Sequence, residues 1–229
     1  GYSRPAIMDV KLGTRTFLEK EVAASKPRAD LAEKMLKLDP TALSDVEREK
    51  GVTKLRYMQF REQRSSSATL GWRIEGWVLP DGDGSEIDFK SLCTPEQLRG
   101  TLEAFTRTAP SERPKIVGCL EKLRSILEGE GSQWFLNHEV VSSSLLFVYE
   151  GDSASRDDGD GSKAKSPGVY MIDFAKTSPI PEDLGPRSHR APWVPGNHED
   201  GYLFGLDNLI DMWRGIAADD APAMNGNGS

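Results

Sequence analysis

The segment from Pro5 to Leu12 constrains the fold most, because it places an acid and a base inside an otherwise apolar run. In a β-strand, successive side chains point to opposite faces. The apolar residues at positions 8, 10 and 12 would then share one face, while Asp9 and Lys11 share the other. Burying an unpaired charge costs several kcal/mol, so this pair must neutralise itself, reach solvent or line a cleft. The strand alone does not decide between a structural ion pair, which is the commoner case, and a functional site.

Length and composition bound the class of protein. The 229 residues fit one large domain or two small ones, and 37% hydrophobic with 28% charged residues is typical of a soluble globular protein. No apolar run approaches the roughly 20 residues of a membrane span, and no signal peptide is recognisable. Two cysteines cannot build a disulfide framework, and the three histidines lack metal-site spacing. We therefore expect a cytoplasmic protein without a zinc site.

Charge is distributed unevenly along the chain. The net charge is −7, but residues 1–64 carry 14 Lys and Arg against 10 Asp and Glu. Nucleic acid is a poor partner for so acidic a protein, whereas its basic front part can hold a small polyanion. A surface of mixed charge without any ligand is the alternative.

The hydrophobic patterning predicts an α+β fold with a mostly antiparallel sheet and packed helices, rather than a doubly wound parallel sheet. Helical signals cover residues 13–28, 29–40, 44–47, 94–105, 114–131 and 199–213. Strand signals cover residues 5–12, 138–151 and 168–178, together with a hairpin over 68–90. The strands that flank the acidic segment 150–167 are expected to pair antiparallel.

Three segments differ from the main body, which spans residues 1–217. Residues 28–52 form a small polar helical insert that is too poor in apolar residues to fold alone. Residues 150–167 are acidic and small, which predicts a flexible surface loop. Residues 218–229 are expected to be a disordered tail.

The charged groups on the strands suggest phosphate chemistry without a familiar phosphate loop. The sequence contains no G-x-x-x-x-G-K-[ST], G-x-G-x-x-G, H-R-D or G-x-S-x-G motif. Asp9 and Lys11 lie on the first strand, and Asp173 and Lys176 follow the last. Phosphoryl transfer to an alcohol needs carboxylates for the metal ion and the hydroxyl, and lysines for the moving charge. The alternative is that such aspartates only cap turns.

Three motifs, read together, identify a family. "PAIMDVKLG" fits P-x-x-x-D-x-K-x-G, and "SSLLF" and "IDFAKT" follow in order. They resemble the inositol polyphosphate kinase family. "TKLRYMQFRE" and "HEDGYLFGLDNLI" are similar to its inositol 1,4,5-trisphosphate 3-kinase branch. The likeness extends from about residue 5 to residue 210.

The resemblance implies the larger lobe of a kinase fold shared with protein kinases and SAICAR synthase, in which residues 28–52 are a substrate-binding insert. In this family a smaller lobe precedes the first motif and supplies nucleotide contacts. Residues 1–229 alone are therefore expected to bind ATP weakly and to turn over little.

The resemblance also implies site residues. Asp9 and Lys11 would be catalytic, with Asp9, Ser143 and Asp173 contacting the nucleotide. Asp173 would hold Mg2+. The residues expected to bind the inositol phosphate are Lys11, Arg28, Lys54, Tyr57, Met58, Arg61 and Lys176. Core packing is the alternative for Tyr57 and Met58. Ala175 replaces the usual glycine of this motif, which a turn tolerates if φ is negative.

The implied reaction is ATP- and Mg2+-dependent phosphorylation of inositol 1,4,5-trisphosphate at the 3-hydroxyl, giving inositol 1,3,4,5-tetrakisphosphate in calcium signalling. The alternatives are a broader multikinase, a hexakisphosphate kinase and a non-catalytic inositol phosphate binding module. The branch is associated with calmodulin, whose contacts are expected upstream of this chain rather than on "EKMLKLD".

Overall fold

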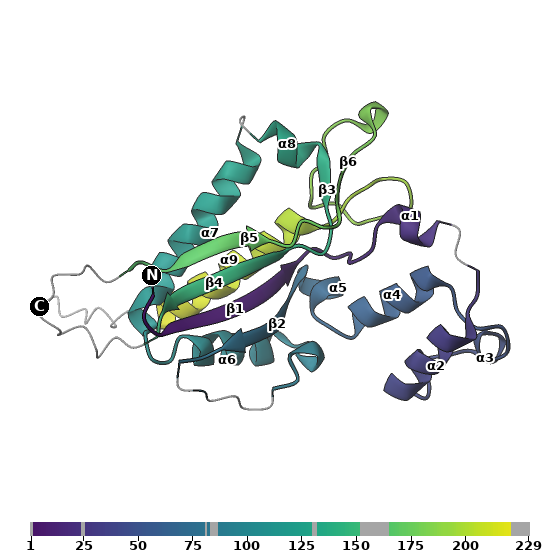
Figure 1. The fold of residues 1–229 in the computed structure, drawn as a ribbon, viewed down its shortest axis with the longest axis horizontal. Coiled ribbons are helices and arrows are strands. Elements are labelled where there is room, and N and C mark those ends of the chain that lie inside the picture. Colours follow the sequence, from purple (N-terminus) through teal and green to yellow (C-terminus); the bar gives the residue numbers. More distant parts are fainter. Residues whose placement is uncertain are drawn as a thin grey trace, which may run out of the picture.

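A four-stranded antiparallel sheet organises the chain (Figure 1). Its order is β2-β1-β4-β5, with β1 at Pro5–Leu12, β2 at Trp72–Val78, β4 at Ser144–Glu150 and β5 at Gly168–Ile172. The computed structural model describes residues 2–23, 26–80, 82, 87–129, 132–151 and 165–220. Every strand pair in this sheet is antiparallel, including the expected pair of β4 with β5. The α+β prediction is confirmed.

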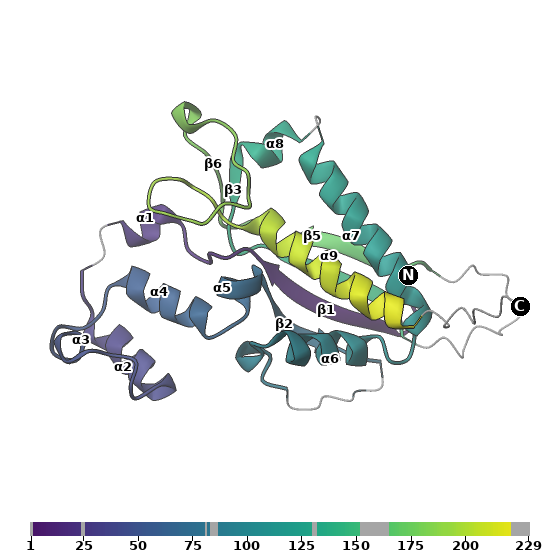
Figure 2. The ribbon, with the colours of Figure 1, turned by 180° about the vertical axis from the view of Figure 1, so that it is seen from behind.

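Helices cover one face of the sheet only. Figure 2 shows α9 (Tyr202–Asp219) and α7 (Arg113–Glu128) lying across this face, with α6 (Pro95–Phe105) at one edge. Figure 1 looks onto the opposite face, over which none of the described helices passes. Val78 and Tyr170 on that face are 63% and 52% exposed.

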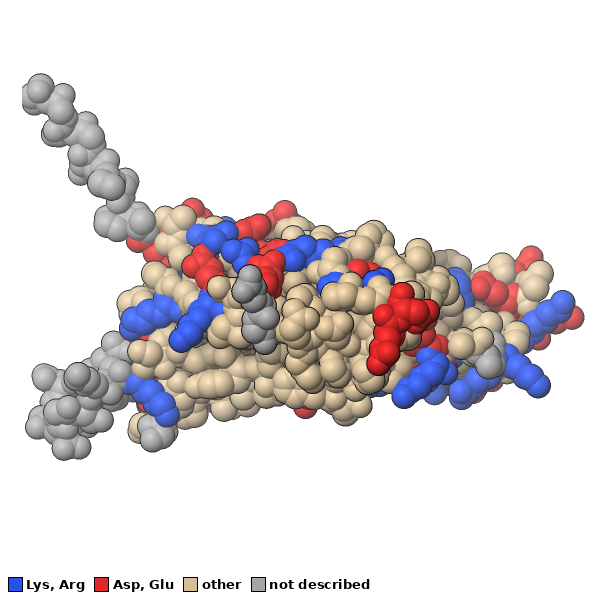
Figure 3. All heavy atoms as spheres, turned by 90° about the horizontal axis from the view of Figure 1, so that it is seen from above, with Lys and Arg blue, Asp and Glu red and all other residues tan. Residues whose placement is uncertain are grey.

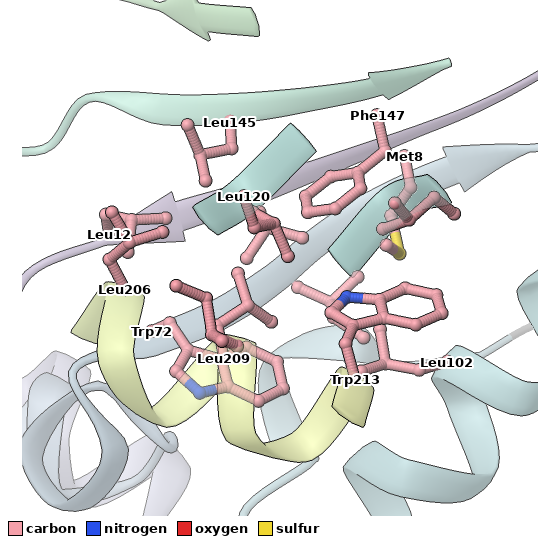
Figure 4. Close-up of a cluster of buried hydrophobic side chains, with 14 of the residues drawn as sticks. Met8, Leu12, Trp72, Leu102, Leu120, Leu145, Phe147, Leu206, Leu209 and Trp213 are labelled. Atoms are coloured by element: carbon pink, nitrogen blue, oxygen red, sulfur yellow. The ribbon is translucent and has the colours of Figure 1, made fainter. Parts of the chain in front are cut away.

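The alternation predicted for β1 is observed. Met8, Val10 and Leu12 are fully buried, and Asp9 and Lys11 lie on the open face. Figure 4 shows the buried strand side chains directed toward α9. They pack there with residues such as Trp72, Leu206, Leu209 and Trp213. Burial of each large apolar side chain stabilises the fold by about 1.5–3 kcal/mol.

The helical insert has a small core of its own. It contains α2 (Ala29–Leu38) and α3 (Asp45–Lys50), and it packs on α4 (Lys54–Gln63). Ser44 and Glu47 form a capping box at the start of α3, within the helical signal predicted over residues 44–47. The buried cluster consists of Leu31, Ala32, Met35, Leu43, Val52 and Phe60. Because α4 supplies Phe60, the insert is tied to the helix that follows it.

Short elements complete the fold. The strands β3 (His138–Val140) and β6 (Thr177–Pro179) pair antiparallel in a separate two-stranded sheet. The remaining short helices are α1 (Glu19–Val22), α5 (Ser67–Leu70), α8 (Gln133–Leu136), and the 3-10 turns η1 (Phe89–Ser91), η2 (Pro110–Glu112) and η3 (Glu182–Leu184).

Two of the elements predicted in the N-terminal half of the chain are wrong. The helix expected over 13–28 is reduced to α1, because the buried Arg15 side chain donates to the carbonyl oxygens of Phe17 and Glu199 and holds this segment outside a helix. Among the described residues of the hairpin expected over 68–90, β2 is the only strand. The expected second strand is replaced by η1, whose first turn is capped by the Asp88 carboxylate.

Predictions further along the chain also need correction. The strand expected over 138–151 is divided into β3 and β4, because Ser142 has a left-handed φ of 61°. Helix α9 continues through Asp219, so the tail expected from residue 218 begins too early. Residues 152–164 of the acidic loop and residues 221–229 of the tail lie outside the described residues.

Gly205 allows α9 to approach the turn before β2. A Cβ on Gly205 would lie 1.9 Å from the Gly71 carbonyl oxygen, and Gly71 has a φ of 71°. Gly205→Ala is therefore expected to lower the free energy of unfolding by about 1–3 kcal/mol in urea denaturation. Gly100→Ala in α6 is the control, since nothing lies within 4 Å of its Cβ position. It should stabilise by about 0.5–1 kcal/mol. Equal effects of the two substitutions would contradict the close approach.

Candidate active site

Asp9 is a partly buried acid on the open face of the sheet. Its Oδ1 atom has no hydrogen-bond partner among the described residues. Burial raises the pKa of Asp9 above its ordinary value, and the Ser144 hydroxyl and Lys11 oppose this rise. Glu75 and Asp173 add repulsion. This carboxylate is therefore poised to accept a proton or to face a cation.

Asp173 is close enough to Asp9 to influence its titration. Lys11 of β1 pairs with Ser144 of β4, and Ser144 pairs with Ile172 of β5, so Asp173 follows at the end of this row. Two strand spacings amount to about 10 Å. Asp173 has a φ of 64°, a left-handed conformation that Asp adopts more readily than most residues. Asp173, one of the two acids predicted for one site, thus lies near enough to raise the pKa of the other, Asp9.

Lys11 and Arg73 of β2 both contact Glu75, which connects this acidic region to the next strand. Its Nζ atom lies 3.9 Å from Glu75 Oε1, and Arg73 Nε donates to the same oxygen at 2.7 Å. Among the described residues, the ion pair of Lys11 is thus with Glu75. The simple structural pair between Asp9 and Lys11, the alternative left open by the sequence, is not formed.

A basic pocket adjoins Arg73. Its volume is about 480 Å³, and it lies between α4, the segment before α1, and the chain around η1. The charged residues that line it are Arg61, Arg64, Arg73, Lys90 and Asp88. Four cations against one acid suit a ligand with several phosphates. Figure 3 shows Lys and Arg side chains beside Asp and Glu side chains at the end of the molecule that carries α2–α4.

Helix α4 presents the predicted substrate residues on one face. Lys54, Tyr57, Met58 and Arg61 follow each other at i, i+3, i+4 and i+7. Met58 and Arg61 line the basic pocket, and Arg61 Nη1 donates to the Tyr57 hydroxyl at 3.2 Å. Tyr57 also packs at the edge of the insert core, so core packing is part of its role.

Two predicted substrate lysines meet at Glu21 of α1. Lys54 Nζ lies 3.2 Å from Glu21 Oε1, and Lys176 Nζ lies 2.8 Å from Glu21 Oε2. Lys176 also donates to the carbonyl oxygen of Thr16, which lines the basic pocket. The turn that carries Lys176 includes Ala175, which is not among the residues with positive φ. Ala175 therefore meets the condition expected from the sequence.

Arg28 lies apart from this lysine pair in its described contacts. It precedes α2, and its guanidinium binds Asp30 at 2.7 Å with an exposed fraction of 54%. Its backbone forms an isolated bridge with Val52. A substrate contact of Arg28 stays a prediction.

Ser143, just before β4, and Ser144, the first residue of β4, face different neighbours. Ser144 lies beside Asp9, whereas Ser143 is fully buried next to Tyr202. Burial raises the pKa of the Tyr202 phenol, and the Ser143 hydroxyl opposes the rise. Ser144 is thus the serine that the fold brings to Asp9. The nucleotide contact predicted for Ser143 stays a prediction.

The donor set limits how a metal ion can be held. Within the described ranges, no group of three or more His, Cys, Asp or Glu side chains could form a complete metal site. Mg2+ usually binds one or two carboxylates together with substrate phosphates and water. The unpartnered Asp9 oxygen and the nearby Asp173 fit such a partial site.

Sequence reasoning missed several residues of this region. Arg64 and Arg73 could have been found from the sequence. Arg64 follows Arg61 by three residues at the end of α4, and Arg73 lies two residues before Glu75, on the same face of β2. Lys90 and Glu21 carry no such signal, since tertiary contacts alone place them here.

Comparisons with known proteins agree with the fold and the motifs. A family model described as inositol polyphosphate kinase matches residues 1–214. An inositol-trisphosphate 3-kinase homolog of Caenorhabditis elegans is 44% identical over 212 residues, which cover 92% of this chain and 40% of that protein. Inositol-trisphosphate 3-kinase C of Homo sapiens is 44% identical over 221 residues, with 94% and 30% covered. This chain spans less than half the length of these two relatives.

A solved structure shares the fold. The crystal structure of inositol phosphate multikinase Ipk2 from S. cerevisiae, in complex with ADP and Mn2+, has a TM-score of 0.53 and 19% sequence identity. The match covers 94% of this chain and 80% of that chain. The chain described here belongs to the inositol polyphosphate kinase family. None of the helices in the described ranges has the length and apolar character required to cross a bilayer.

The ionisation of Glu21 predicts a pH-dependent stability. Burial alone would raise the pKa of Glu21, but hydrogen bonds from Lys176, the Leu18 backbone and Lys54 lower this pKa from 4.5 to about 2. Glu21 therefore stabilises the folded state above pH 4.5, and this contribution is lost as the pH falls toward about 2. The difference in Tm between wild type and Glu21→Gln should be smaller at about pH 3 than at about pH 6. A difference that does not change with pH would contradict these ion pairs.

Proposed function

We propose that the protein containing this chain transfers the γ-phosphoryl group of ATP to the 3-hydroxyl of inositol 1,4,5-trisphosphate. The observation that carries the proposal is that Glu75, which with Asp173 raises the pKa of Asp9, also binds Arg73 in the wall of the basic pocket. An anion-binding protein gains nothing from two carboxylates beside its ligand. A phosphotransferase needs both groups.

Each chain residue has a role that follows from its surroundings. Asp9, with its raised pKa, accepts the proton of the attacking hydroxyl better than an ordinary carboxylate does. The hydroxyl oxygen then forms the new bond to phosphorus, and ADP leaves. Lys11 stabilises the charge on the transferred group. Arg61, Arg64 and Lys90 bind substrate phosphates in the pocket.

Mg2+ and ATP are the expected cofactor and phosphoryl donor. Asp173 would hold Mg2+, with Asp9 beside it, and the ion would neutralise the negative charge of the nucleotide phosphates. The yeast structure in complex with ADP and Mn2+ supports this assignment by family membership. Nucleotide binding by Ser143 or Ser144 belongs to the same proposal.

The inositol trisphosphate branch is favoured over a multikinase or a hexakisphosphate kinase. The helical insert packs on α4 through its own core, so α4 with Lys54, Tyr57, Met58 and Arg61 is held as a rigid wall of the site. The named relatives at 44% identity are inositol-trisphosphate 3-kinases. Comparing turnover of inositol 1,4,5-trisphosphate with that of more highly phosphorylated inositols tests this choice.

Calmodulin contacts are proposed to lie outside residues 1–229. Leu31, Ala32 and Met35 of α2 are buried in the insert core and are not available to a partner, although Leu38 at the end of this helix is exposed. A cytoplasmic location and a role in calcium signalling stay predictions from the family resemblance.

Asp173→Asn separates an enzyme from a binding module. In the full-length protein, Mg2+-dependent turnover should fall by about 100-fold or more, because the metal loses its carboxylate ligand. Affinity for inositol 1,4,5-trisphosphate, measured by calorimetry, should stay equal or become tighter. A variant with wild-type turnover, or a wild-type protein that binds the trisphosphate but never phosphorylates it, would refute the enzymatic assignment.

A further inference from the structure

Three segments that are distant in the sequence converge on one carboxylate. Glu21 of α1 contacts Lys54 at the start of α4 through Oε1 and Lys176 of the β5–β6 turn through Oε2. Lys176 is 155 residues away from Glu21 along the chain. Both lysines are predicted substrate ligands, whereas Glu21 itself is outside the set of substrate and catalytic residues.

Glu21 is held in place by its own helix. Its Oε2 atom accepts a hydrogen bond from the Leu18 backbone N–H at 2.8 Å, which is the half of a capping box that a Glu at the third helical position supplies. The side chain is 25% exposed, so water screens it only in part. The carboxylate is consequently a fixed anion against which two flexible ammonium groups can be ordered.

The geometry leaves Lys176 able to bind a ligand. An ammonium group has three donors. One donates to Glu21 Oε2 at 2.8 Å and one to the Thr16 carbonyl oxygen at 3.2 Å, which leaves the third for a phosphate oxygen. Thr16 is fixed in turn, because its N–H and hydroxyl both donate to Glu62 Oε1. Since Thr16 lines the basic pocket, the ammonium group of Lys176 is oriented at the edge of that pocket.

We propose that Glu21 is a positioning residue that orders Lys54 and Lys176 for the phosphates of the inositol substrate. Without the Glu21 carboxylate between them, the ammonium groups of Lys54 and Lys176 would repel each other. A positioned lysine loses less side-chain freedom when the substrate binds, so affinity is higher. This inference rests on the proposed function, since it assigns the pocket to an inositol phosphate.

The chain offers a closely matched control. Glu47 of α3 also occupies the third helical position, caps the Ser44 backbone N–H at 2.9 Å and pairs with a cation of α4, Arg56, at 2.9 Å. Its exposed fraction is 26%, against 25% for Glu21. Gln supports a capping box as Glu does, so Glu21→Gln and Glu47→Gln remove the same kind of ion pair and keep the helix start.

The test measures binding of two ligands to the full-length protein by calorimetry. Glu21→Gln should weaken inositol 1,4,5-trisphosphate binding about tenfold and leave the affinity for ATP with Mg2+ within about twofold. Glu47→Gln should leave both affinities within about twofold. Glu21→Asp keeps the charge but shortens the reach, so it too should weaken trisphosphate binding.

Several outcomes would overturn the positioning role. Unchanged or tighter trisphosphate binding in Glu21→Gln means that Glu21 is indifferent or competes with the substrate. Equal losses for both ligands mean a general structural role, and wild-type affinity in Glu21→Asp means that charge alone matters. A wild-type protein that fails to bind the trisphosphate refutes the proposed function and the positioning role together, whereas wild-type binding with an unaffected Glu21→Gln refutes only the latter.

Discussion

Asp9→Asn is expected to lower turnover about a thousandfold, within the range that a general base contributes. The amide cannot accept the proton of the attacking hydroxyl, although it fills the same space. Steady-state assays of the full-length protein with ATP, Mg2+ and inositol 1,4,5-trisphosphate measure this loss. Turnover within about tenfold of wild type would exclude Asp9 as the proton acceptor.

The same substitution should raise the thermal stability. Burial raises the pKa of Asp9 in the folded state. The ionised carboxylate therefore lowers the free energy of unfolding once the pH exceeds the ordinary pKa of 3.8. Asn removes this cost at neutral pH, and it also removes the repulsion from Glu75 and Asp173. A higher Tm together with lost turnover separates a role in chemistry from unfolding. Asp207→Asn is the control, because Asp207 pairs with Arg124 and Arg190 outside the site and should lose stability but keep turnover.

Glu139→Gln is expected to destabilise the protein by about 3–5 kcal/mol, because it leaves the buried Arg15 without its counter-ion. The Arg15 and Glu139 side chains are 2% and 5% exposed, and they meet at 2.8 Å. Urea denaturation measures the change in the free energy of unfolding.

An exposed pair provides the comparison. Arg99 and Glu103 of α6 are 35% and 41% exposed, so Glu103→Gln should cost less than about 1 kcal/mol. Equal costs for the two substitutions would show that burial does not govern the Arg15 pair. Because Arg15 also fixes the segment that carries Thr16, this buried pair supports the wall of the basic pocket.

Patterns of local periodicity predicted the central parts of the fold. The alternation along β1 and the apolar stripes of α6, α7 and α9 follow from the sequence because each element buries one face against the sheet. The capping boxes at Ser44 and Thr94 were likewise readable, since both partners lie within four residues.

The errors arose where tertiary contacts outweigh local preference. Residues 13–18 have a helical pattern, but the buried Arg15 side chain donates to the carbonyl oxygen of Phe17 in the same segment and to that of the distant Glu199, which prevents a helix there. The break between β3 and β4 depends on one left-handed residue, Ser142, which no periodicity reveals. A window along the chain detects neither the Arg15 contact with Glu199, 184 residues away, nor a single left-handed residue.

In the candidate site, too, some residues were predictable from the sequence and others were not. Asp9, Lys11, Asp173 and Lys176 were predicted from motifs, and the fold brings Asp173 near enough to raise the pKa of Asp9. The partners that set their environment, Glu21, Glu75 and Arg73, were not predicted. Motifs identify the groups that react, whereas these neighbouring residues become visible only when the strands and helices are assembled.

Product analysis tests the central claim most directly. The full-length wild-type protein is incubated with Mg2+, ATP and inositol 1,4,5-trisphosphate, and the inositol product is identified by phosphorus and proton NMR. We predict a single product, inositol 1,3,4,5-tetrakisphosphate, formed in equal amount with ADP and formed about a thousandfold more slowly by Asp9→Asn. Release of ADP without a phosphorylated inositol, or a phosphate on another hydroxyl, would contradict the account.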